Sequence, residues 1–368
     1  MFSKEEIRAI AGAFDLKGDY LGFAPVITGH INNTLRLDYT DNGAPKRYIL
    51  QNINTTVFRD PEVLMQNVSR TTAFVYDKLQ QRGGAENRCL VCYPTKTGKT
   101  YYTDEQGRVW RVYNFIENSV SYDLLSDETL FYKAAKGFGE YANLLSDFPM
   151  DALGETIPDF HHTAKRYQTF LAAVEENAAG RRDTCRPEID FVTARADVTH
   201  AITDLLENGS LPLRVTHNDT KLNNILFDRD TNEPVCVVDL DTVMPGSCLY
   251  DFGDAIRAGA STAAEDEEDV SKVHLDLGLF AAYVKGFLEA AGDALTPLEI
   301  ELLPLGAKVI TFECGMRFLT DYLQGDVYFR TAYPTHNLVR CRTQFALVAD
   351  MERRWDELQR IVREAQNR

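Results

Sequence analysis

A short polar stretch in the middle of the chain, RVTHNDTKLNNILFD at 214–228, carries side chains that suit phosphoryl transfer. Asp219 stands two residues before Lys221 and five before Asn224, and an apolar run follows at once. An aspartate in this place can align a hydroxyl nucleophile and accept its proton, and a neighbouring lysine can neutralise charge on the group being transferred. Asp219 and Lys221 are therefore candidate catalytic residues.

The next apolar run, VCVVDLDT, predicts a strand that returns antiparallel to the first one. Asp, Asn and Pro between the two runs indicate a turn near residue 231, and the register of that hairpin places Asn224 opposite Asp239. Amide and carboxylate oxygens are ligands that Mg²⁺ prefers, and Mg²⁺ completes its shell with waters and substrate phosphates. Asp241 projects to the same strand face as Asp239 and is a further candidate ligand, directly or through water.

Each of these residues alone has a plainer explanation. Residues 217–219 could form a simple turn, Asn224 could be a cap, and Asp239 could be a surface carboxylate. Further along, YDFGDAIR contains the Asp-Phe-Gly that holds Mg²⁺ in protein kinases, but its Asp251 lies outside the hairpin register. We interpret Asp251 and Asp254 as cap and scaffold residues and keep Asp239 as the metal ligand.

The elements that must position these side chains divide the chain in two. Short strands separated by turns are expected first, then one helix from Pro61 to about Gly83, then further strands. Beyond them apolar residues recur mostly at helical spacing, interrupted by the hairpin. The sequence therefore predicts an α+β fold, with an N-terminal antiparallel sheet and one main helix over 1–116 and a mostly helical part that carries the hairpin over 117–368.

An acidic run, AEDEEDVSK at 264–272, could suggest a cation site, but its spacing matches no calcium loop. Acidic residues in the first turn of a helix interact favourably with the helix dipole. The run is therefore expected to be the solvated start of a helix over 266–291.

His217-x-Asp219-x-x-x-x-Asn224, followed by an aspartate on the next strand, resembles the catalytic loop and metal-binding aspartate of the protein-kinase-like superfamily. Asn218 takes the position of the Arg found in protein kinases, and no APE segment is recognisable. The chain is in this respect similar to the aminoglycoside phosphotransferase and choline kinase family. The resemblance implies a bilobal protein-kinase-like fold, with a nucleotide-binding lobe over 1–116 and a helical lobe with the catalytic loop and sugar site over 117–368.

The same resemblance indicates where a nucleotide would bind. TGHINNT at 28–34 takes the place of the phosphate-covering loop, although it holds a single Gly. The third strand ends in Gln51, where the superfamily usually has Lys, and Phe115 to Glu117 fit the hinge that meets adenine. The candidate cofactor-binding residues are Gly29, His30, Ile31, Asn32, Gln51, Phe115, Ile116 and Glu117.

Longer runs, among them RYILQNINTTVF, WRVYNFIENSVSY and ECGMRFLTDYLQGDVYF, are similar to bacterial members of this family that phosphorylate N-acetylhexosamines. The resemblance implies an ATP- and Mg²⁺-dependent anomeric kinase that converts GlcNAc or GalNAc to the sugar 1-phosphate, with Asp219 accepting the anomeric hydroxyl proton.

Arg317 and Tyr328 are the candidate sugar contacts, because GMRFLTDYLQGDVYF places an arginine and a phenol after a helical stretch. Alternatively, Arg317 pairs with Glu313 one helical turn earlier and Tyr328 belongs to the core. A kinase of another small acceptor, such as homoserine, choline, methylthioribose or another sugar, stays open. So does a non-catalytic nucleotide-binding scaffold, which the neutral Gln51 suggests.

The overall composition narrows the partners. The chain of 368 residues has 39 Lys and Arg against 55 Asp and Glu, a net charge of −16, and no basic block, which argues against a nucleic-acid partner. The charged N-terminus lacks the apolar core of a secretory signal, no apolar run approaches the length of a membrane span, and the cysteines are scattered. A cytoplasmic protein with reduced thiols, no nucleic-acid or membrane partner and no obligate protein partner is therefore expected. The small-molecule sugar substrate is implied by the family resemblance alone.

Overall fold

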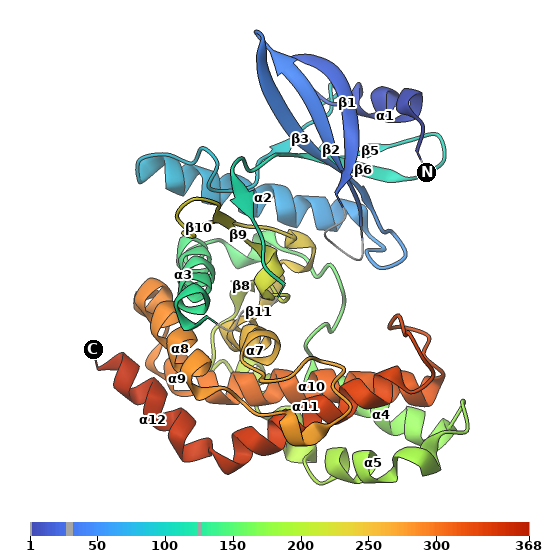
Figure 1. The fold of residues 1–368 in the computed structure, drawn as a ribbon, viewed down its shortest axis with the longest axis vertical. Helices are drawn as coiled ribbons and strands as arrows, with labels where there is room; N and C mark the ends of the chain where they lie inside the picture. The colour runs from blue at the N-terminus through green and yellow to red at the C-terminus, as the bar shows by residue number, and fades with distance from the viewer. Residues whose placement is uncertain (1, 27–31, 124–126, 368) are drawn as a thin grey trace. The chain divides into compact units, whose positions relative to one another are not determined.

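The computed structural model describes residues 2–26, 32–123 and 127–367, and the chain forms two compact units (Figure 1). The sheet unit comprises Met1–Val120, Asp147–Pro158 and Leu226–Pro245, and the helical unit comprises Ser121–Ser146, Asp159–Ile225 and Gly246–Arg368. The sequence suggested a single boundary after residue 116, whereas the division by contacts is discontinuous. The extent of the two functional lobes therefore stays a prediction.

The sheet unit contains most of the strands. Its elements are α1 (Lys4–Ala11), β1 (Asp19–Val26), β2 (Asn33–Asp41), β3 (Ala44–Ile53), α2 (Pro61–Gln81), β4 (Cys92–Tyr93), β5 (Tyr102–Thr103), β6 (Val109–Asn114), β7 (Ser119–Val120), the short 3₁₀ helix Met150–Ala152, β9 (Ile225–Asp228), β10 (Pro234–Val237) and the 3₁₀ helix Leu240–Thr242. The strands β1, β2, β3, β6 and β4 lie in that order in one antiparallel sheet, with β5 beside β6, and β10, β9 and β7 form a second sheet.

Local sequence explains the turn between β2 and β3 and the start of α2. Asn42 and Gly43 both have positive φ, 51° and 81°, which is the geometry of the two-residue turn that joins β2 to β3. Asp60 caps α2 by accepting the backbone N–H of Glu62 and Val63, each at 3.1 Å, and Pro61 occupies the first helical turn. The predicted helix and the antiparallel strands around it are confirmed.

The two faces of the sheet have different surroundings. On one face, α1 packs its buried side chains against a core that includes Leu37, Tyr48 and Trp110 (Figure 1). The next residue of β6, Arg111, points to the other face because side chains alternate along a strand, and there its guanidinium lies 3.9 Å from the Met65 sulfur of α2. A charged residue is thus buried between the sheet and α2.

The helical unit is organised around its longest helix. Its elements are α3 (Glu128–Leu144), α4 (Thr163–Glu176), the 3₁₀ helices Arg182–Cys185 and Ala196–His200, α5 (Arg186–Thr193), α6 (Thr203–Glu207), β8 (Arg214–Thr216), the 3₁₀ helix Leu222–Asn224, α7 (Cys248–Gly259), the 3₁₀ helices Val270–Lys272 and Gly292–Ala294, α8 (Leu277–Ala291), α9 (Pro297–Glu301), α10 (Leu303–Gln324), α11 (His336–Arg353) and α12 (Trp355–Gln366). The strand β11 (Met244–Gly246) runs across the boundary of the two units.

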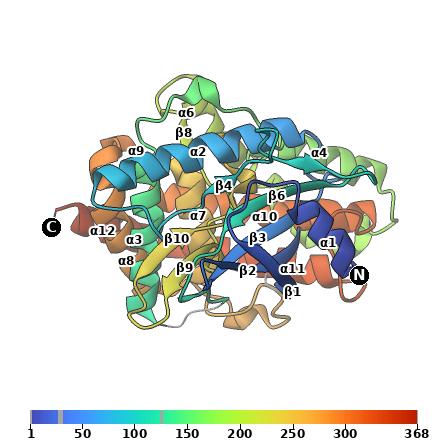
Figure 2. The ribbon, with the colours of Figure 1, turned by 90° about the horizontal axis from the view of Figure 1, so that it is seen from above.

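Helix α10 contacts α4, α7 and α11, and it lies beside α11 in both views (Figure 1 and Figure 2). Gly253 of α7 and Gly306 of α10 allow the closest approach, because a Cβ at Gly253 would overlap the Gly306 carbonyl oxygen. Most of α10 is buried, including the charged Glu313 and Asp321. Helix α7, which carries Asp251, is therefore packed firmly against the centre of the unit.

Two further expectations can be compared with the structure. The predicted hairpin is present, because β9 and β10 pair and Asp228 N–H donates to the Glu233 carbonyl at 2.8 Å. The helix expected over 266–291 is wrong at its start: α8 begins at Leu277, where Asp276 caps it, and the acidic run lies in turns and a short 3₁₀ helix before it. Among the described residues, no helix combines the length and apolarity that a bilayer crossing requires.

Candidate active site

The candidate catalytic residues lie in the loop that follows β8. Lys221 Nζ is 2.8 Å from Asp219 Oδ1. The Asn224 side-chain amide donates to Asp219 Oδ2 at 2.9 Å and to the Asp219 carbonyl at 2.8 Å. The side chains of Asp219 and Lys221 keep 26% and 45% of their surface exposed, so both remain accessible to a ligand. The loop therefore gathers three of the predicted residues around one carboxylate.

Two opposing effects act on the charge of Asp219. Burial raises its pKa, but the positive charge of Lys221 and hydrogen bonds from Lys221 and Asn224 outweigh burial and hold the pKa below its ordinary value. Burial lowers the pKa of Lys221, but the carboxylates of Asp219 and Asp254 raise it above its usual range. Both groups are charged at neutral pH, and Asp219 is consequently a weak base.

A buried aspartate on α7 fixes the start of this loop. The Asp251 carboxylate accepts the backbone N–H of His217 at 2.8 Å and of Asn218 at 2.7 Å, and its carbonyl oxygen accepts from the Thr220 hydroxyl. Burial raises the pKa of Asp251, although His217 and the two amides act in the opposite direction. The scaffold role expected for Asp251 is confirmed.

Asn224 and Asp239 are the predicted magnesium ligands. Asn224 uses its side-chain nitrogen for Asp219, which leaves its carbonyl oxygen as the atom that could ligate a cation. Asp239 follows β10 with a left-handed backbone, φ 58°. Both offer the hard oxygen donors that Mg²⁺ prefers, and within the described residues no three His, Cys, Asp or Glu side chains converge into a metal-binding group. The two residues belong to different units, so their cross-strand relation stays a prediction.

A connected network of polar side chains in the sheet unit joins three other predicted residues. Asn32 donates to Asp241 Oδ2 at 2.6 Å, and Arg111 Nη1 lies 2.5 Å from Asp241 Oδ1. Arg111 Nε donates to Gln51 Oε1 at 3.0 Å, and Gln51 Nε2 donates to the Thr34 hydroxyl at 3.0 Å. Asn32, Gln51 and Asp241 thus lie together, with Arg111 at the centre.

Arg111 was missed by the sequence analysis. The one available signal was register: pairing RYILQNI with RVWRVYN as antiparallel neighbours sets Arg111 opposite Gln51, as the structure does. Burial lowers the pKa of Arg111, but the Asp241 carboxylate outweighs this and raises the pKa above its ordinary value. Asp241 is 2% exposed, its Oδ2 accepts from Asn32 and its Oδ1 lies in the ion pair with Arg111. Ligation of a metal by Asp241, directly or through water, stays a prediction.

The structure describes only some of the other predicted nucleotide contacts. Gly29, His30 and Ile31 lie outside the described residues. At the expected hinge, Ile116 is buried, and the Glu117 backbone is occupied by the Asn87 side chain, which accepts from Glu117 N–H at 2.6 Å and donates to its carbonyl at 2.9 Å.

Phe115 lies beside that hinge, and its ring faces the Arg47 guanidinium, 4.6 Å from the ring centroid. Because Asn87 already uses both backbone groups of Glu117, the predicted adenine contact falls more readily on the backbone of Phe115. Contacts of Phe115, Ile116 and Glu117 with adenine stay predictions.

The candidate sugar contacts lie together at the end of α10. The Arg317 guanidinium faces the rings of Phe160, Tyr328 and Phe329, with centroid distances of 5.4, 5.8 and 5.6 Å. Tyr328 is 62% exposed, so the alternative that placed it in the core is wrong. The alternative interaction of Arg317 with Glu313 is present only as an electrostatic one: the charge of Arg317 lowers the pKa of Glu313, but no ion pair joins the two side chains among the described residues.

Glu313 instead connects α10 to the catalytic loop. It lies 2.8 Å from His161 Nδ1 and accepts from the Thr163 hydroxyl at 2.6 Å, and His161 Nε2 is 3.5 Å from the Asn218 carbonyl oxygen. Burial raises the pKa of Glu313, but His161, Arg317 and Thr163 together lower it by more. The net pKa is therefore below the ordinary value. Arg317 therefore lies one helical turn from Glu313, whose partner His161 approaches the backbone of Asn218, the residue before Asp219.

A second buried aspartate holds the loop that carries Tyr328. The Asp321 carboxylate accepts three consecutive backbone N–H groups, those of residues 327, 328 and 329, at 2.9, 2.8 and 2.9 Å. Asn337 donates to the same carboxylate at 2.8 Å. Asp321 is 2% exposed, whereas Tyr328 projects into solvent. The position of Tyr328 is therefore set by a buried side chain that the sequence analysis did not single out.

A family model described as "Phosphotransferase enzyme family" matches residues 25–296 of the chain. The chain belongs to this family. The match includes residues 217–224, Asp239 and the Arg111 network, whereas the candidate sugar contacts Arg317 and Tyr328 lie beyond its end.

The phosphotransferase also has the fold of solved small-molecule kinases. A microcompartment-associated aminopropanol kinase is 14% identical, with a TM-score of 0.62 over 96% of this chain and 98% of that one. A Plasmodium vivax ethanolamine kinase is 15% identical, with a TM-score of 0.54 over 88% and 81%. The GDP complex of aminoglycoside 2'-phosphotransferase-IIIa is 11% identical, with a TM-score of 0.57 over 94% and 99%. The expected kinase-like α+β fold is confirmed.

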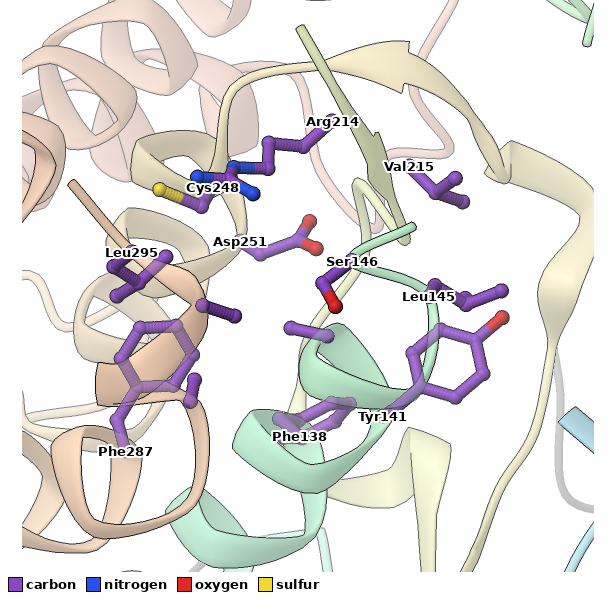
Figure 3. Close-up of a pocket in the computed structure, with 13 residues that line it drawn as sticks. Phe138, Tyr141, Leu145, Ser146, Arg214, Val215, Cys248, Asp251, Phe287 and Leu295 are labelled. Carbon is purple, nitrogen blue, oxygen red and sulfur yellow. The ribbon is translucent and has the colours of Figure 1, made fainter. Parts of the chain in front are cut away.

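A separate pocket of the phosphotransferase lies in the helical unit (Figure 3). Apolar side chains of α3 and α8 form much of its lining, and Figure 3 shows Asp251, Ser146 and Arg214 among its polar groups. Arg214 is already paired with Glu299 at 2.7 Å, and Asp251 holds the catalytic loop. Since Asp219, Lys221 and Asn224 are not part of the lining, this pocket is not the site of phosphoryl transfer.

Proposed function

We propose that this phosphotransferase is an anomeric kinase that transfers the γ-phosphoryl group of ATP, with Mg²⁺, to O1 of an N-acetylhexosamine, GlcNAc or GalNAc. The observation that carries the proposal is the Arg317 guanidinium. It forms no ion pair among the described residues, is framed by three aromatic rings, and lies one turn from the Glu313–His161 contact to the catalytic loop.

The catalytic loop supports the transfer step. An ionised Asp219 can accept a hydrogen bond from the acceptor hydroxyl and orient it, and it takes the proton as the new O–P bond forms. The anomeric hydroxyl is more acidic than an ordinary alcohol, so a carboxylate with a lowered pKa is a sufficient base for it. Lys221 offsets negative charge on the transferred group, while its pairing with Asp219 fixes the carboxylate.

The nucleotide half of the reaction depends on residues that fit a magnesium nucleotide. Bound Mg²⁺ supplies charge neutralisation at the phosphates, and Asn224 and Asp239 would hold it through their side-chain oxygens. Asp241 would support this arrangement through its contacts with Asn32 and Arg111. Backbone groups of residues 29–32 would face the phosphates and those of Phe115 the adenine, as the family resemblance implies.

The acceptor half favours a neutral polar ligand. A planar guanidinium can donate two parallel hydrogen bonds to a carbonyl or a pair of hydroxyls, and exposed aromatic faces suit the apolar face of a sugar ring. An N-acetylhexosamine offers all three features. Tyr328, exposed beside Arg317, can contribute both its ring and its hydroxyl.

The same charges act against amine acceptors. Three of the similar structures are named as aminopropanol, ethanolamine and choline kinases, whose acceptors carry a cationic nitrogen. In this chain a second guanidinium, Arg166, adds to the positive field at Arg317: burial lowers the pKa of Arg166 and the charge of Arg317 lowers it further. Like charges close together in a partly buried site repel a third cation.

An acceptor screen tests the proposal. Purified protein with Mg²⁺ and ATP is offered GlcNAc, GalNAc, other hexoses, ethanolamine, choline, homoserine and methylthioribose, and ADP release is measured. We expect ADP release with an N-acetylhexosamine and a product whose anomeric proton couples to phosphorus in the NMR spectrum. Release only with an amino alcohol, or a product phosphorylated at O6, would contradict the proposal. No ADP release with any of the offered acceptors would instead favour the non-catalytic scaffold.

A further inference from the structure

Gln51 leaves the end of β3 without a positive charge, but a guanidinium lies directly beside it. Antiparallel register sets Gln51 opposite Arg111 of β6, and the two side chains are joined by the 3.0 Å hydrogen bond from Arg111 Nε to Gln51 Oε1. Arg111 is 1% exposed. The charge that a kinase sheet needs near its nucleotide is therefore present, on the neighbouring strand.

Arg111 forms an ion pair with a carboxylate that is equally buried. Its Nη1 is 2.5 Å from Asp241 Oδ1, and the two side chains are 1% and 3% exposed. Its guanidinium also faces the Tyr113 ring, 5.0 Å from the centroid. A buried ion pair of this kind stabilises a fold no better than well-packed apolar residues would, so its presence calls for a role other than stability.

The ion pair reaches the segment that would cover the phosphates. Asp241 Oδ2 accepts from the Asn32 side chain at 2.6 Å, and Asn32 Oδ1 accepts the backbone N–H of Asn54 at 2.9 Å. Asn32 is thus fixed at both ends of its amide, immediately after residues 28–31 of TGHINNT. On the other side of Arg111, Gln51 passes the contact to Thr34 at the start of β2.

We propose that Arg111 is the positioning cation of the nucleotide site. It fixes Asp241, and through Asp241 and Gln51 it fixes Asn32 and Thr34, so that the carboxylate and the amide that would support a magnesium nucleotide are held in place. Arg111 takes the place, one strand away, of the lysine that kinases carry on their third strand. This inference rests on the proposed nucleotide-dependent function.

Binding of ADP with Mn²⁺ in place of Mg²⁺ tests the inference without turnover, because free Mn²⁺ gives an electron paramagnetic resonance signal that is lost on binding. We expect Arg111→Gln to weaken Mn²⁺·ADP binding by about 10–100-fold, the usual effect of removing a residue that orients the groups around a metal. Arg111→Lys keeps the charge and should recover most of the affinity. The exposed Arg36, paired with Asp38 on β2, is the matched control, and Arg36→Gln should bind as the wild type does.

The decisive variant moves the charge back to β3. In Arg111→Gln/Gln51→Lys the cation stands on the strand opposite, and we expect this double variant to bind Mn²⁺·ADP more tightly than Arg111→Gln and to lower its KM for ATP while kcat changes less. A purely structural role for Arg111 would not be restored by a second-site lysine. Binding by folded Arg111→Gln within twofold of the wild type, or a double variant no better than the single one, would overturn the inference.

Arg111→Gln leaves a buried carboxylate unpaired and could unfold the sheet unit. Asn32→Ala avoids this, because it leaves the Arg111–Asp241 pair intact and removes the hydrogen bonds of Asn32 with Asp241 and with the Asn54 backbone N–H. A loss of about three- to tenfold in Mn²⁺·ADP affinity is expected for it, in proportion to one charge-assisted hydrogen bond. Unchanged affinity of Asn32→Ala would overturn the inference. A wild-type protein that does not bind Mn²⁺·ADP would instead contradict the proposed function itself.

Discussion

The catalytic loop and the Arg111 network hold charged side chains in two different ways. Asp219, Lys221 and Asn224 are close in sequence, and the first two are 26% and 45% exposed. Arg111 and Asp241 are far apart in sequence and almost fully buried. An exposed pair costs little to break, whereas a buried charge that loses its partner is strongly destabilising. The loop can therefore change its contacts during a reaction, while the network fixes positions.

Removing the charge of Asp219 tests the reactive side of this comparison and has the largest expected effect. We expect Asp219→Asn to lower kcat by about 10²–10⁴, the range of a lost general base, with little change in the unfolding temperature because the side chain is partly exposed. Steady-state ADP release and thermal unfolding measure both quantities. Asp183→Asn, at a carboxylate that is 92% exposed, is the control. A kcat within threefold of the wild type would show that Asp219 is not the base.

Asp251 combines features of the two regions: it is buried like the Arg111 network, but it supports the exposed catalytic loop. Asp251→Asn can keep only one acceptor oxygen for the two backbone amides of His217 and Asn218, at 2.8 and 2.7 Å. Loss of one charge-assisted bond, about 1.5–3 kcal/mol, should lower kcat by about 10–100-fold and also lower the unfolding temperature. A variant that loses stability but keeps kcat would show that Asp251 supports the fold without affecting catalysis by the loop.

A substitution of Arg317 tests whether this side chain acts on the acceptor, as the catalytic loop is expected to act on the transferred group. Arg317→Lys keeps the charge but loses the planar fork, so KM for the sugar should rise about tenfold while KM for ATP stays unchanged. The exposed Arg330 provides a control, Arg330→Lys, on the following segment. Equal changes in both KM values would indicate that Arg317 acts on the fold and not on the acceptor.

Asp321 is the counterpart of Arg111 within the helical unit, a buried charge that fixes an exposed segment. In Asp321→Asn the three amides of residues 327–329 lose a charged acceptor. We expect KM for the sugar to rise about threefold to tenfold with kcat nearly unchanged, because Tyr328 becomes less well ordered. Titration calorimetry with the sugar gives an independent affinity. An unaltered affinity in a folded variant would mean that Tyr328 is not a sugar contact.

The smallest kinetic effect is expected for a buried ion pair remote from catalysis. Glu299 is bonded to Arg214 at 2.7 and 2.8 Å. Burial raises the pKa of Glu299, but Arg214 and the Thr296 amide lower it more, so the folded-state pKa lies below the unfolded one. The stabilisation is therefore fully present above the unfolded pKa, about 4.3, and is lost as pH falls through the folded pKa.

Glu299→Gln should consequently unfold at a lower temperature than the wild type at pH 7, and the difference should narrow as pH falls below about 4. KM and kcat should not change. Differential scanning calorimetry across this pH range measures the effect, and Glu207→Gln, at a largely exposed carboxylate, is the control. A difference that grows toward acid pH would have the wrong sign for this account.

Sequence patterns predicted the fold well where local chemistry decides it. The turn at Asn42-Gly43 and the helix that starts at Asp60-Pro61 are both determined by backbone preferences of a few adjacent residues. The acidic run at 264–272 gave a wrong helix start, because acidic residues also occur in exposed turns. The actual cap, Asp276, stands where the apolar periodicity begins.

The two halves of the site differ in the same way. The spacing of Asp219, Lys221 and Asn224 was visible because one loop contains them all. Arg111 was not visible, because its role depends on strand pairing and on Asp241, which joins the same unit from far along the chain. Asp321 was hidden for a related reason: a lone carboxylate within an apolar helix shows its purpose only when the three amides that it binds are located.

The Asp321 arrangement also bears on how this protein could be redesigned. Within residues 327–329 the carboxylate contacts the backbone N–H groups and no side chain, so it places no demand on which side chains those positions carry. Val327 and Tyr328 are 75% and 62% exposed and are free of the core. A library randomised at these two positions should consist mostly of folded proteins and is a natural starting point for changing acceptor preference.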